Sequence, residues 1–479
     1  MSYGYLAAYY RKYSKYGAEV IFKTIDCAPS FNYKSLRQVN SILKKLSGSD
    51  IVAFATITQD HNKTLALSHA VKEALKVPII YGGHHISALP ETLPDFIDAA
   101  VIGEGEQTFL ELLDSFIENN AFTPDKLKMI RGIAFHETEK VVITERRELI
   151  KNLDSIPSPD RSIFDKKYFQ TKIGWSENIE LTGKIIANMS ISRGCPYNCI
   201  FCSSSKQWGN TIRFFSDSHV VSEIEELVNR YGVQTIQITD DLISIDANRL
   251  EALYGILEER KLINKIEFGA IQIRANLLTE RLCKILKKIK VKILGMGIES
   301  GSEKILSFLK GGNITVEKNF QAVKLAHSWG FKVWPQLITG IPGETKEDIK
   351  KTLKFCSLDG VEYYQITMLT PLPGTELWNY ALTKGLVSND MDWEKLSLNL
   401  SRQNLEKRVY LGDLVTRQEA WKMIELPLAM VQRKKSLNYK VDIRNYGIRY
   451  LESAIKDPIK YLRLIFQIFY IKFFYGKLK

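Results

Sequence analysis

Strand-like and helix-like segments alternate through the first 130 residues of the chain. Short apolar runs predict strands at residues 18–26, 50–58, 77–85 and 99–106, and the segments between them repeat apolar residues at helical spacing. Apolar strands separated by helices are typical of a parallel sheet covered on both faces. A hairpin is predicted at residues 132–149, so this half is expected to form a doubly wound α/β domain.

A second series of alternating segments follows a proline-containing linker. It comprises six strand–helix units, strand first, which predicts a barrel or partial barrel of parallel strands. These strands are predicted at residues 185–194, 233–241, 266–275, 291–301, 332–345 and 361–374. The predicted domains are an α/β domain over 1–145, a linker over 146–184, a barrel over 185–395 and a helical region over 396–479. Functional residues are expected at the carboxyl ends of the strands.

The net charge of +12 is concentrated near the carboxyl terminus. Residues 433–479 carry twelve Lys or Arg and three acidic residues, a net of +9, so the rest of the chain is nearly neutral. Basic and aromatic residues interleave over 459–479, which suits an amphipathic helix at an anionic membrane interface. The alternative is a terminal helix docked on the barrel. No nucleic-acid recognition motif accompanies these residues, so no nucleic-acid partner is expected.

The first residues lack the apolar core and small-residue cleavage site of a signal peptide. The chain is therefore expected to be cytoplasmic, with peripheral contact at the inner face of the membrane if the basic tail inserts there. Cytoplasmic thiols stay reduced, so clustered cysteines in this chain indicate metal or redox chemistry rather than disulfides.

Half of the six cysteines lie in one short loop after the first predicted barrel strand. Cys195, Cys199 and Cys202 form the pattern C-x3-C-x2-C, which can hold three thiolates on one face of a metal cluster. Zinc sites favour four ligands, and the next histidine, His219, lies seventeen residues beyond Cys202. Three ligands leave one cluster iron open for a substrate. An incomplete zinc site or chance clustering is the alternative.

The segment over residues 185–374 resembles the radical S-adenosylmethionine (SAM) superfamily. Its sequence CPYNCIFC fits the cysteine signature of that family and places Phe201 before the third cysteine, where it is expected to shield the cluster and border SAM. The resemblance implies a [4Fe–4S] cluster on the three cysteines, with SAM bound to the fourth iron. It also implies cleavage of SAM to methionine and a 5′-deoxyadenosyl radical, with electrons from ferredoxin or flavodoxin.

Polar residues and glycines at the later strand ends are similar to residues that contact SAM in that family. In chain order, the resemblance assigns the acids to the SAM ammonium, the arginine to its carboxylate, the glutamate and serine to the ribose, and the glycines to the adenine. Ordinary ion pairs and tight turns are the alternative for each residue. The candidates are Asp240, Asp241, Gln272, Arg274, Glu299, Ser300, Gly340 and Gly343.

The strand ends of the first domain carry hydroxyls and glycines that could line a ligand crevice or only form tight turns. They are Thr56, Thr58, Gly82, Gly83, Gly103, Glu104 and Gly105. A parallel sheet before the barrel, with GGHH and GEGE turns, resembles the cobalamin-binding class of radical SAM enzymes, whose Rossmann-like domain holds the corrin at this edge. The motif D-x-H-x-x-G for an axial histidine is absent, since His61 directly follows Asp60. The first strand of that domain is expected to be missing, because the chain begins in a predicted helix.

The resemblance implies cobalamin-dependent methylation of an unactivated carbon in a small molecule or lipid. Cyclisation and oxidation stay open, because enzymes of that class perform both. A tRNA methylthiotransferase would need a second cluster in the first domain, where Cys27 is the only cysteine. A non-catalytic iron–sulfur protein is the remaining alternative, and the set of SAM-site residues argues against it.

Overall fold

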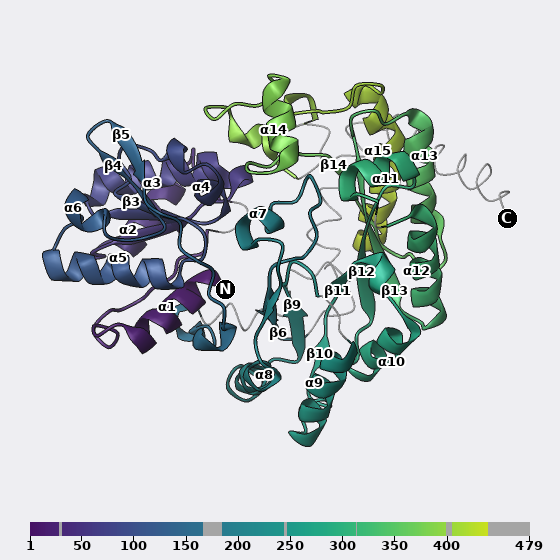
Figure 1. Ribbon diagram of the computed structural model, residues 1–479, viewed down its shortest axis with the longest axis horizontal. Coiled ribbons are helices and arrows are strands. Elements are labelled where there is room, and N and C mark those ends of the chain that lie inside the picture. The colour runs from purple at the N-terminus through teal and green to yellow at the C-terminus, as the bar shows by residue number, and fades with distance from the viewer. Residues whose placement is uncertain (28–30, 166–183, 244–246, 313, 399–404, 439–479) are drawn as a thin grey trace. The chain divides into compact units, whose positions relative to one another are not determined.

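The computed structural model describes residues 1–27, 31–165, 184–243, 247–312, 314–398 and 405–438. The chain divides into two compact units, residues 1–426 and residues 427–479. Both predicted α/β segments lie in the first unit (Figure 1). The basic tail over 459–479 lies outside the described residues, so its membrane contact stays a prediction, as do the predicted domain limits.

The first α/β segment forms a five-stranded sheet in the order β1 to β5. Strands β1 (Val52–Ala55), β2 (Ile79–Gly82) and β3 (Ala99–Val101) are parallel, and β4 (Ile133–Glu137) and β5 (Lys140–Ile143) form the predicted hairpin. The helices are α1 (Ser2–Tyr13), α2 (Leu36–Leu46), α3 (His61–Leu75), α4 (His84–Ala88), α5 (Glu106–Asn119) and α6 (Pro124–Leu127). The predicted doubly wound arrangement is confirmed.

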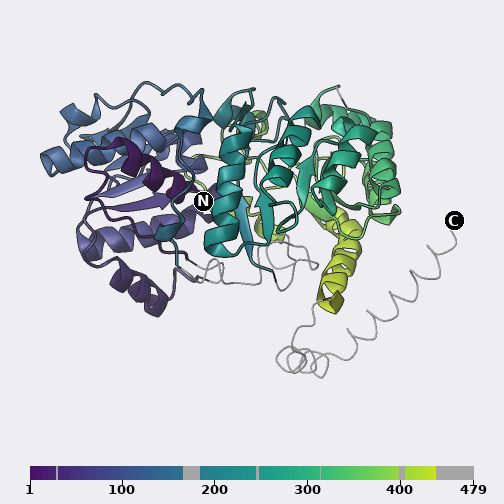
Figure 2. The same ribbon diagram turned by 90° about the horizontal axis from the view of Figure 1, so that it is seen from below.

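Alternate residues of the strands face opposite layers of helices. Ile80 packs with Tyr10 of α1 and Phe109 of α5 in one apolar cluster. Its neighbours on the strand, Ile79 and Tyr81, instead join a cluster that includes Val71 of α3. Because side chains alternate across a strand, each central strand is apolar on both faces. Figure 2 shows this strand layer between helices.

The strand predicted over residues 18–26 is wrong. The structure has an extended segment there without a ladder partner. The Thr24 amide donates to the Ile163 carbonyl at 3.2 Å, and Phe22 packs against the α1–α5 cluster. The apolar pattern that suggests a strand thus reflects packing on helices, and β1 is the edge of the sheet among the described residues.

The second α/β segment is a partial barrel of parallel strands. Its strands are β6 (Ile186–Met189), β9 (Thr235–Ile238), β10 (Glu267–Phe268), β11 (Ile271–Ile273), β12 (Ile293–Glu299), β13 (Lys332–Thr339) and β14 (Gln365–Met368). Each pairs in parallel with the next in this order, except that β10 and β11 do not pair with each other. Its helices are α8 (Asp217–Tyr231), α9 (Ala247–Glu259), α10 (Glu280–Lys288), α11 (Glu303–Lys310), α12 (Val316–Ser328), α13 (Lys346–Leu353) and α14 (Glu376–Thr383). Helices α12 and α13 lie along the outside of β12 and β13 (Figure 1). The six predicted strand–helix units are confirmed.

The third predicted barrel strand, residues 266–275, is broken into β10 and β11. The Gln237 side chain donates to the Ala270 carbonyl at 2.7 Å, and a Cβ atom on Gly269 would lie 2.2 Å from Gln237 Oε1. The side chain therefore occupies the place of a ladder hydrogen bond. The break divides the barrel strands into a three-stranded and a four-stranded sheet.

The predicted helical region is only partly helical where the structure describes it. Residues 405–438 contain one 3-10 turn, η10 (Leu405–Lys407), and one long helix, α15 (Arg417–Asn438). None of the described helices is long and apolar enough to cross a membrane.

A buried ion pair ties the linker to the barrel. Arg161 pairs with Glu223 of α8, and both side chains are almost fully buried. We predict that Glu223→Gln lowers the free energy of unfolding by about 3 kcal/mol, because it leaves a buried guanidinium without its counter-charge.

The matched control is Glu226→Gln on the same helix, which removes the exposed Arg230–Glu226 pair and should cost less than about 1 kcal/mol. Urea unfolding of both variants measures the difference. Equal losses would show that the buried pair contributes no more than a surface pair.

Candidate active site

The cysteine loop leaves the barrel through a short antiparallel ribbon. The ribbon pairs β7 (Ser192–Arg193) with β8 (Arg213–Phe214), and helix α7 (Ser204–Trp208) lies within the loop. Gly194 follows β7 with φ +100°, and a Cβ atom there would lie 2.2 Å from the Thr211 carbonyl oxygen. Only glycine fits this close approach without displacing the ribbon.

Backbone hydrogen bonds at Ile200 hold the loop against the barrel. The Ile200 amide donates to the Leu309 carbonyl at 3.1 Å, and the Leu377 amide donates to the Ile200 carbonyl at 3.1 Å. Ile200 and Phe201 pack against an apolar cluster that contains Leu309 and Leu377. Helices α11 and α14 thus fix the loop between its second and third cysteines. The prediction that Phe201 borders the cluster and SAM stays a prediction.

Cys195, Cys199 and Cys202 are free, partly buried thiols. Burial raises the pKa of Cys195 and raises that of Cys202 to about 11. Metal binding at these thiols must therefore displace protons. The described residues contain no group of three His, Cys, Asp or Glu side chains placed to hold a single metal ion. A [4Fe–4S] cluster does not require such convergence, because its thiolates bind separate irons.

Arg274 lies directly beside the cysteine loop, as its predicted role requires. Its Nη1 atom is 3.8 Å from Cys199 Sγ, and its guanidinium lies 3.8 Å from the centre of the Tyr197 ring. Its Nη2 atom is buried without a hydrogen-bond partner. A buried guanidinium nitrogen without an acceptor is costly, so Arg274 fits an anionic ligand such as the carboxylate of SAM.

The two adjacent acids after β9 have different surroundings. Asp240 is buried and accepts hydrogen bonds from the Ile191 amide at 2.9 Å and the Ser192 hydroxyl at 2.5 Å, while burial raises its pKa to about 7. Asp240 therefore braces the start of the ribbon. Asp241 is exposed, and its charge acts on Cys195 and Cys202. Of the two predicted acids, Asp241 is the one open to a ligand.

The two residues predicted to contact the ribose, Glu299 and Ser300, also have different surroundings. Glu299 follows a register shift in β12 and adopts φ +60°, which is rare for a non-glycine residue. Its carboxylate pairs with Lys310 at 3.0 Å. Ser300 is fully buried, and its hydroxyl lies 3.2 Å from that of Thr352. Ser300 thus serves the packing behind the site, and its contact with ribose stays a prediction.

The predicted adenine turn is built around a buried carboxylate. Glu344 accepts hydrogen bonds from the Gly340 amide at 2.7 Å and the Thr339 hydroxyl at 3.0 Å. Gly340 has φ +77°, and a Cβ atom there would lie 2.8 Å from the Tyr410 ring. At Gly343, φ is +72° and a Cβ atom would meet nothing within 4 Å. The Gly343 amide donates to Asp413 at 2.7 Å and its carbonyl accepts from Lys304 at 3.0 Å, so its contact with adenine stays a prediction.

The predicted cobalamin residues lie together at the carboxyl edge of the first sheet. Thr56 is fully buried and donates to the Gly82 carbonyl at 2.9 Å. Gly83 has φ +99°, and a Cβ atom there would lie 2.7 Å from the Thr56 carbonyl oxygen. Both residues build the turn into α4. At Gly103, with φ +81°, a Cβ atom would meet nothing within 4 Å, and its contact with cobalamin stays a prediction.

Thr58 contacts one of two adjacent, tilted histidine rings, a pairing that the sequence did not predict. Its hydroxyl lies 3.2 Å from His85 Nδ1, and the rings of His61 and His85 are 3.8 Å apart. Burial lowers the pKa of His61 to about 4 and that of His85 to about 3, so both rings are neutral at pH 7. Trp393 packs 4.5 Å from His85. Their spacing in sequence gives no signal for this pairing.

Glu104, whose predicted contact with cobalamin stays a prediction, forms ion pairs with the cysteine-loop ribbon. Its Oε1 atom is 2.9 Å from Nη1 of Arg193, and its Oε2 atom is 2.9 Å from Nη1 of Arg213. Glu106, after Gly105, contacts Arg193 at 2.6 Å. Sequence reasoning missed Arg193, Arg213 and Glu106, because arginines near a cysteine loop have many possible partners.

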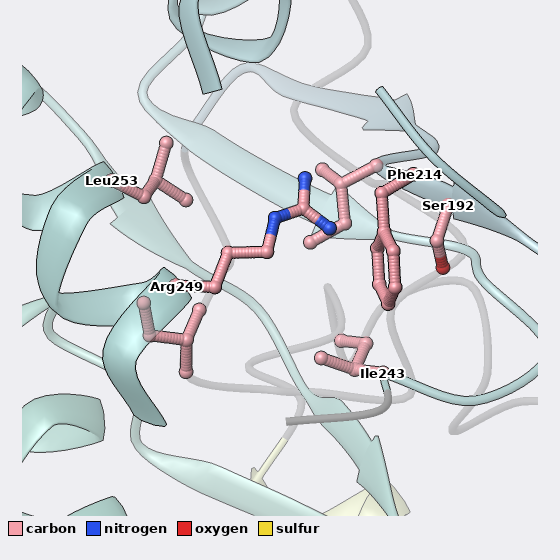
Figure 3. Close-up of a pocket in the computed structure, with 7 residues that line it drawn as sticks. Ser192, Phe214, Ile243, Arg249 and Leu253 are labelled. Atoms are coloured by element: carbon pink, nitrogen blue, oxygen red, sulfur yellow. The ribbon is translucent and has the colours of Figure 1, made fainter. Parts of the chain in front are cut away.

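The other side of the ribbon contacts α9. Arg249 donates to the Phe215 carbonyl at 2.6 Å, and its guanidinium lies 4.3 Å from the centre of the Phe214 ring. Figure 3 shows this arginine reaching toward Phe214 beside a small cavity that Ser192, Ile243 and Leu253 also line. The ribbon is therefore held from the barrel as well as from the first sheet.

Family models match both halves of the site. A model of the radical SAM superfamily matches residues 189–356, and a model of the B12 binding domain matches residues 5–113. An uncharacterized methyltransferase of Pyrococcus horikoshii is 33% identical over 361 residues, which cover 74% of this chain and 74% of that protein. The cytidylyl-2-hydroxyethylphosphonate methyltransferase of Streptomyces wedmorensis is 26% identical, with 80% of this chain and 78% of that protein covered. The anaerobic magnesium-protoporphyrin IX monomethyl ester cyclase of Cereibacter sphaeroides is 28% identical, with 72% and 55% covered.

Two solved structures share the fold. The radical SAM methyltransferase TsrM of Kitasatospora setae matches with a TM-score of 0.61 at 16% identity, covering 82% of this chain and 80% of that chain. The cobalamin-dependent radical enzyme OxsB matches with a TM-score of 0.64 at 17% identity, covering 90% and 64%. The first contains cobalamin and a [4Fe–4S] cluster, and the second contains aqua-cobalamin and SAM.

Each loop cysteine is predicted to be essential for the cluster. Cys195→Ala, Cys199→Ala and Cys202→Ala should each lose bound iron and SAM cleavage, because a thiolate ligand is removed. Cys356→Ala, which changes a cysteine outside the loop, should keep both. Iron analysis and detection of 5′-deoxyadenosine after anaerobic reduction provide the measurements. One fully active loop variant would contradict the assignment.

Glu344 is predicted to make stability depend on pH. Burial raises its pKa to about 7. The contribution of Glu344 to the free energy of unfolding is therefore fully present below about pH 4.5 and is lost as the pH rises through 7. Between pH 5 and 8.5 the free energy of unfolding should fall in the wild type by roughly 3 kcal/mol more than in Glu344→Gln, because glutamine does not ionise. Urea unfolding measures this difference, with Glu347→Gln, an exposed neighbour, as the control. Parallel curves for wild type and Glu344→Gln would contradict the prediction.

The three-cysteine loop at the first barrel strand, the buried arginine beside it and the matched family models lead to one conclusion. The chain belongs to the radical SAM superfamily, in the class that carries a cobalamin-binding domain, and is an enzyme that uses a [4Fe–4S] cluster, SAM and cobalamin.

Proposed function

We propose that this enzyme transfers a methyl group from SAM to an unactivated carbon of a small molecule. The observation that carries the proposal is the direct contact between the two cofactor regions. Glu104 lies between Gly103 and Gly105 at the predicted cobalamin edge, and it pairs with Arg193, two residues before Cys195. A methyl carrier and a radical source must act on one substrate, and this contact supports their proximity.

The cofactors supply the methyl group and the hydrogen-abstracting radical, while the residues of the chain bind and orient SAM. Arg274 is proposed to hold the SAM carboxylate, since its buried Nη2 atom lacks a partner. Asp241, exposed beside the loop, is proposed for the SAM ammonium. Glu299 is proposed to accept from the ribose hydroxyls, and its ion pair with Lys310 holds the carboxylate in place.

Amide side chains on the barrel strands indicate the polarity of the substrate. Asn188 and Gln237 are register partners on β6 and β9, and Gln336 Nε2 donates to Gln272 Oε1 at 3.1 Å. A Cβ atom on Gly295 would lie 2.3 Å from Gln272 Oε1, so glycine makes room for the amide. All four amides are only partly buried. They favour a substrate with neutral hydrogen-bonding groups, since burying partly exposed amides against an apolar surface is costly.

The name of one relative indicates a second possible reaction. The Cereibacter sphaeroides protein is named a cyclase, so cyclisation by the same cofactors is the alternative. Two of the relatives reported above are named methyltransferases, and these names favour methyl transfer. A lipid substrate is tied to the tail prediction and has no support from the described residues.

Reconstitution with iron, sulfide and cobalamin under anaerobic conditions tests the proposal. With SAM and a strong reductant, the enzyme should form 5′-deoxyadenosine and also S-adenosylhomocysteine, the product left when the methyl group of SAM is removed. Enzyme without cobalamin should form 5′-deoxyadenosine only. Cys199→Ala should keep bound cobalt and lose 5′-deoxyadenosine, because only its cluster is damaged. Cobalamin-loaded enzyme that forms no S-adenosylhomocysteine would count against methyl transfer.

A further inference from the structure

Four buried charges join the first domain to the cysteine loop. Arg193, Arg213, Glu104 and Glu106, here called the ribbon clamp, have side chains that are 11%, 12%, 4% and 6% exposed. We propose that Glu104 and Glu106 are positioning residues for the iron–sulfur cluster. They hold the ribbon that carries Cys195 in the shape that binds SAM. This inference rests on the radical SAM assignment and does not depend on methyl transfer.

The ribbon is electrostatically unfavourable without the two carboxylates. Arg193 and Arg213 are direct register partners on β7 and β8. Like charges opposite each other on paired strands destabilise the pairing, and burial strengthens the repulsion because the local dielectric is low. Two glutamates balance two arginines, so the clamp as a whole is neutral. The ribbon therefore depends on the first domain for its charge balance.

Both oxygens of the Glu104 carboxylate have partners in the clamp. Glu104 uses Oε1 for Arg193 and Oε2 for both Arg213 and the Ile150 amide, the last at 2.8 Å. Arg213 also donates to the Ile150 carbonyl at 2.7 Å. Arg193 binds two carboxylates through different nitrogens, which a planar guanidinium does well and an ammonium does not. Glu104 thus has a role at the cluster loop independent of cobalamin contact.

A displacement of the ribbon clamp would also displace Cys195. Arg193 is followed by Gly194 and then Cys195. A Cβ atom on Gly194 would already lie 2.2 Å from the Thr211 carbonyl oxygen, so the two sides of the ribbon are in tight contact. On the barrel side, Asp240 fixes Ile191 and Ser192. The first cysteine is therefore held between a barrel carboxylate and the carboxylates of the clamp.

The experiment uses the full chain with Glu104→Gln and Glu106→Gln. Each variant leaves a buried arginine undercompensated, so we expect less iron per chain after reconstitution. The cluster that does form should show altered electron paramagnetic resonance of its reduced state. It should also bind SAM about tenfold more weakly, judged by the spectral change that SAM produces, which corresponds to about 1.4 kcal/mol. A role confined to folding would lower yield without altering the spectrum.

Two further variants separate the proposal from general disruption. Glu111→Gln breaks the Arg147–Glu111 pair in the same domain without touching the ribbon and should leave the spectrum and SAM binding unchanged. The double variant Glu104→Gln/Arg213→Gln restores charge balance and should recover part of the loss.

If the glutamine variants do not fold, Arg193→Lys tests the same point, because it keeps the charge and loses the two-carboxylate geometry. Wild-type iron content, spectrum and SAM binding in Glu104→Gln, Glu106→Gln or Arg193→Lys would overturn the proposal. So would an equal spectral change in Glu111→Gln.

Discussion

Two arginines facing each other across a two-residue ribbon are the constraint on which the site depends. The ribbon must leave the barrel, carry a loop with three cysteines and return within about 20 residues. Such a short ladder has little stability of its own. Buried carboxylates from the first sheet and from β9 fix it on two sides. The cysteine loop is thus a feature of the whole first unit rather than of the barrel alone.

Close backbone approaches set the remaining geometry. Gly194 lets the two sides of the ribbon touch, Gly83 lets the α4 turn meet Thr56, and Gly295 admits the Gln272 amide. In each place a β-carbon would collide with a neighbouring atom. By contrast, a Cβ atom on Gly103 or Gly343 would meet nothing within 4 Å, and glycine is favoured there by the positive φ alone. The glycines therefore divide into those that permit a close contact and those that permit only a turn.

Burial determines which of two adjacent polar residues is available to contact a ligand. Asp240 and Asp241 are adjacent, yet the first is committed to the ribbon and the second is exposed. Glu299 and Ser300 are also adjacent, yet the serine is fully buried behind the site. The carboxylate of Glu344 is likewise buried, and it accepts hydrogen bonds from the turn that is predicted to lie near the adenine. Sequence motifs of two or three residues cannot make these distinctions. The distinctions depend on whether each side chain at a strand end points into the core or toward solvent.

The sequence by itself determined most of the order of strands and helices, the two α/β halves and the prediction that Cys195, Cys199 and Cys202 hold the cluster. These follow from local periodicity and from spacing within one loop, which depend on residues close in the chain. It could not determine that residues 18–26 pack on helices without a ladder, or that Gln237 interrupts the third barrel strand. Nor could it show that Glu104 reaches Arg193, 89 residues away, and Arg213, 109 residues away. Such contacts join distant segments, and only the tertiary structure decides them, because the partner of a buried charge depends on which elements fold against each other.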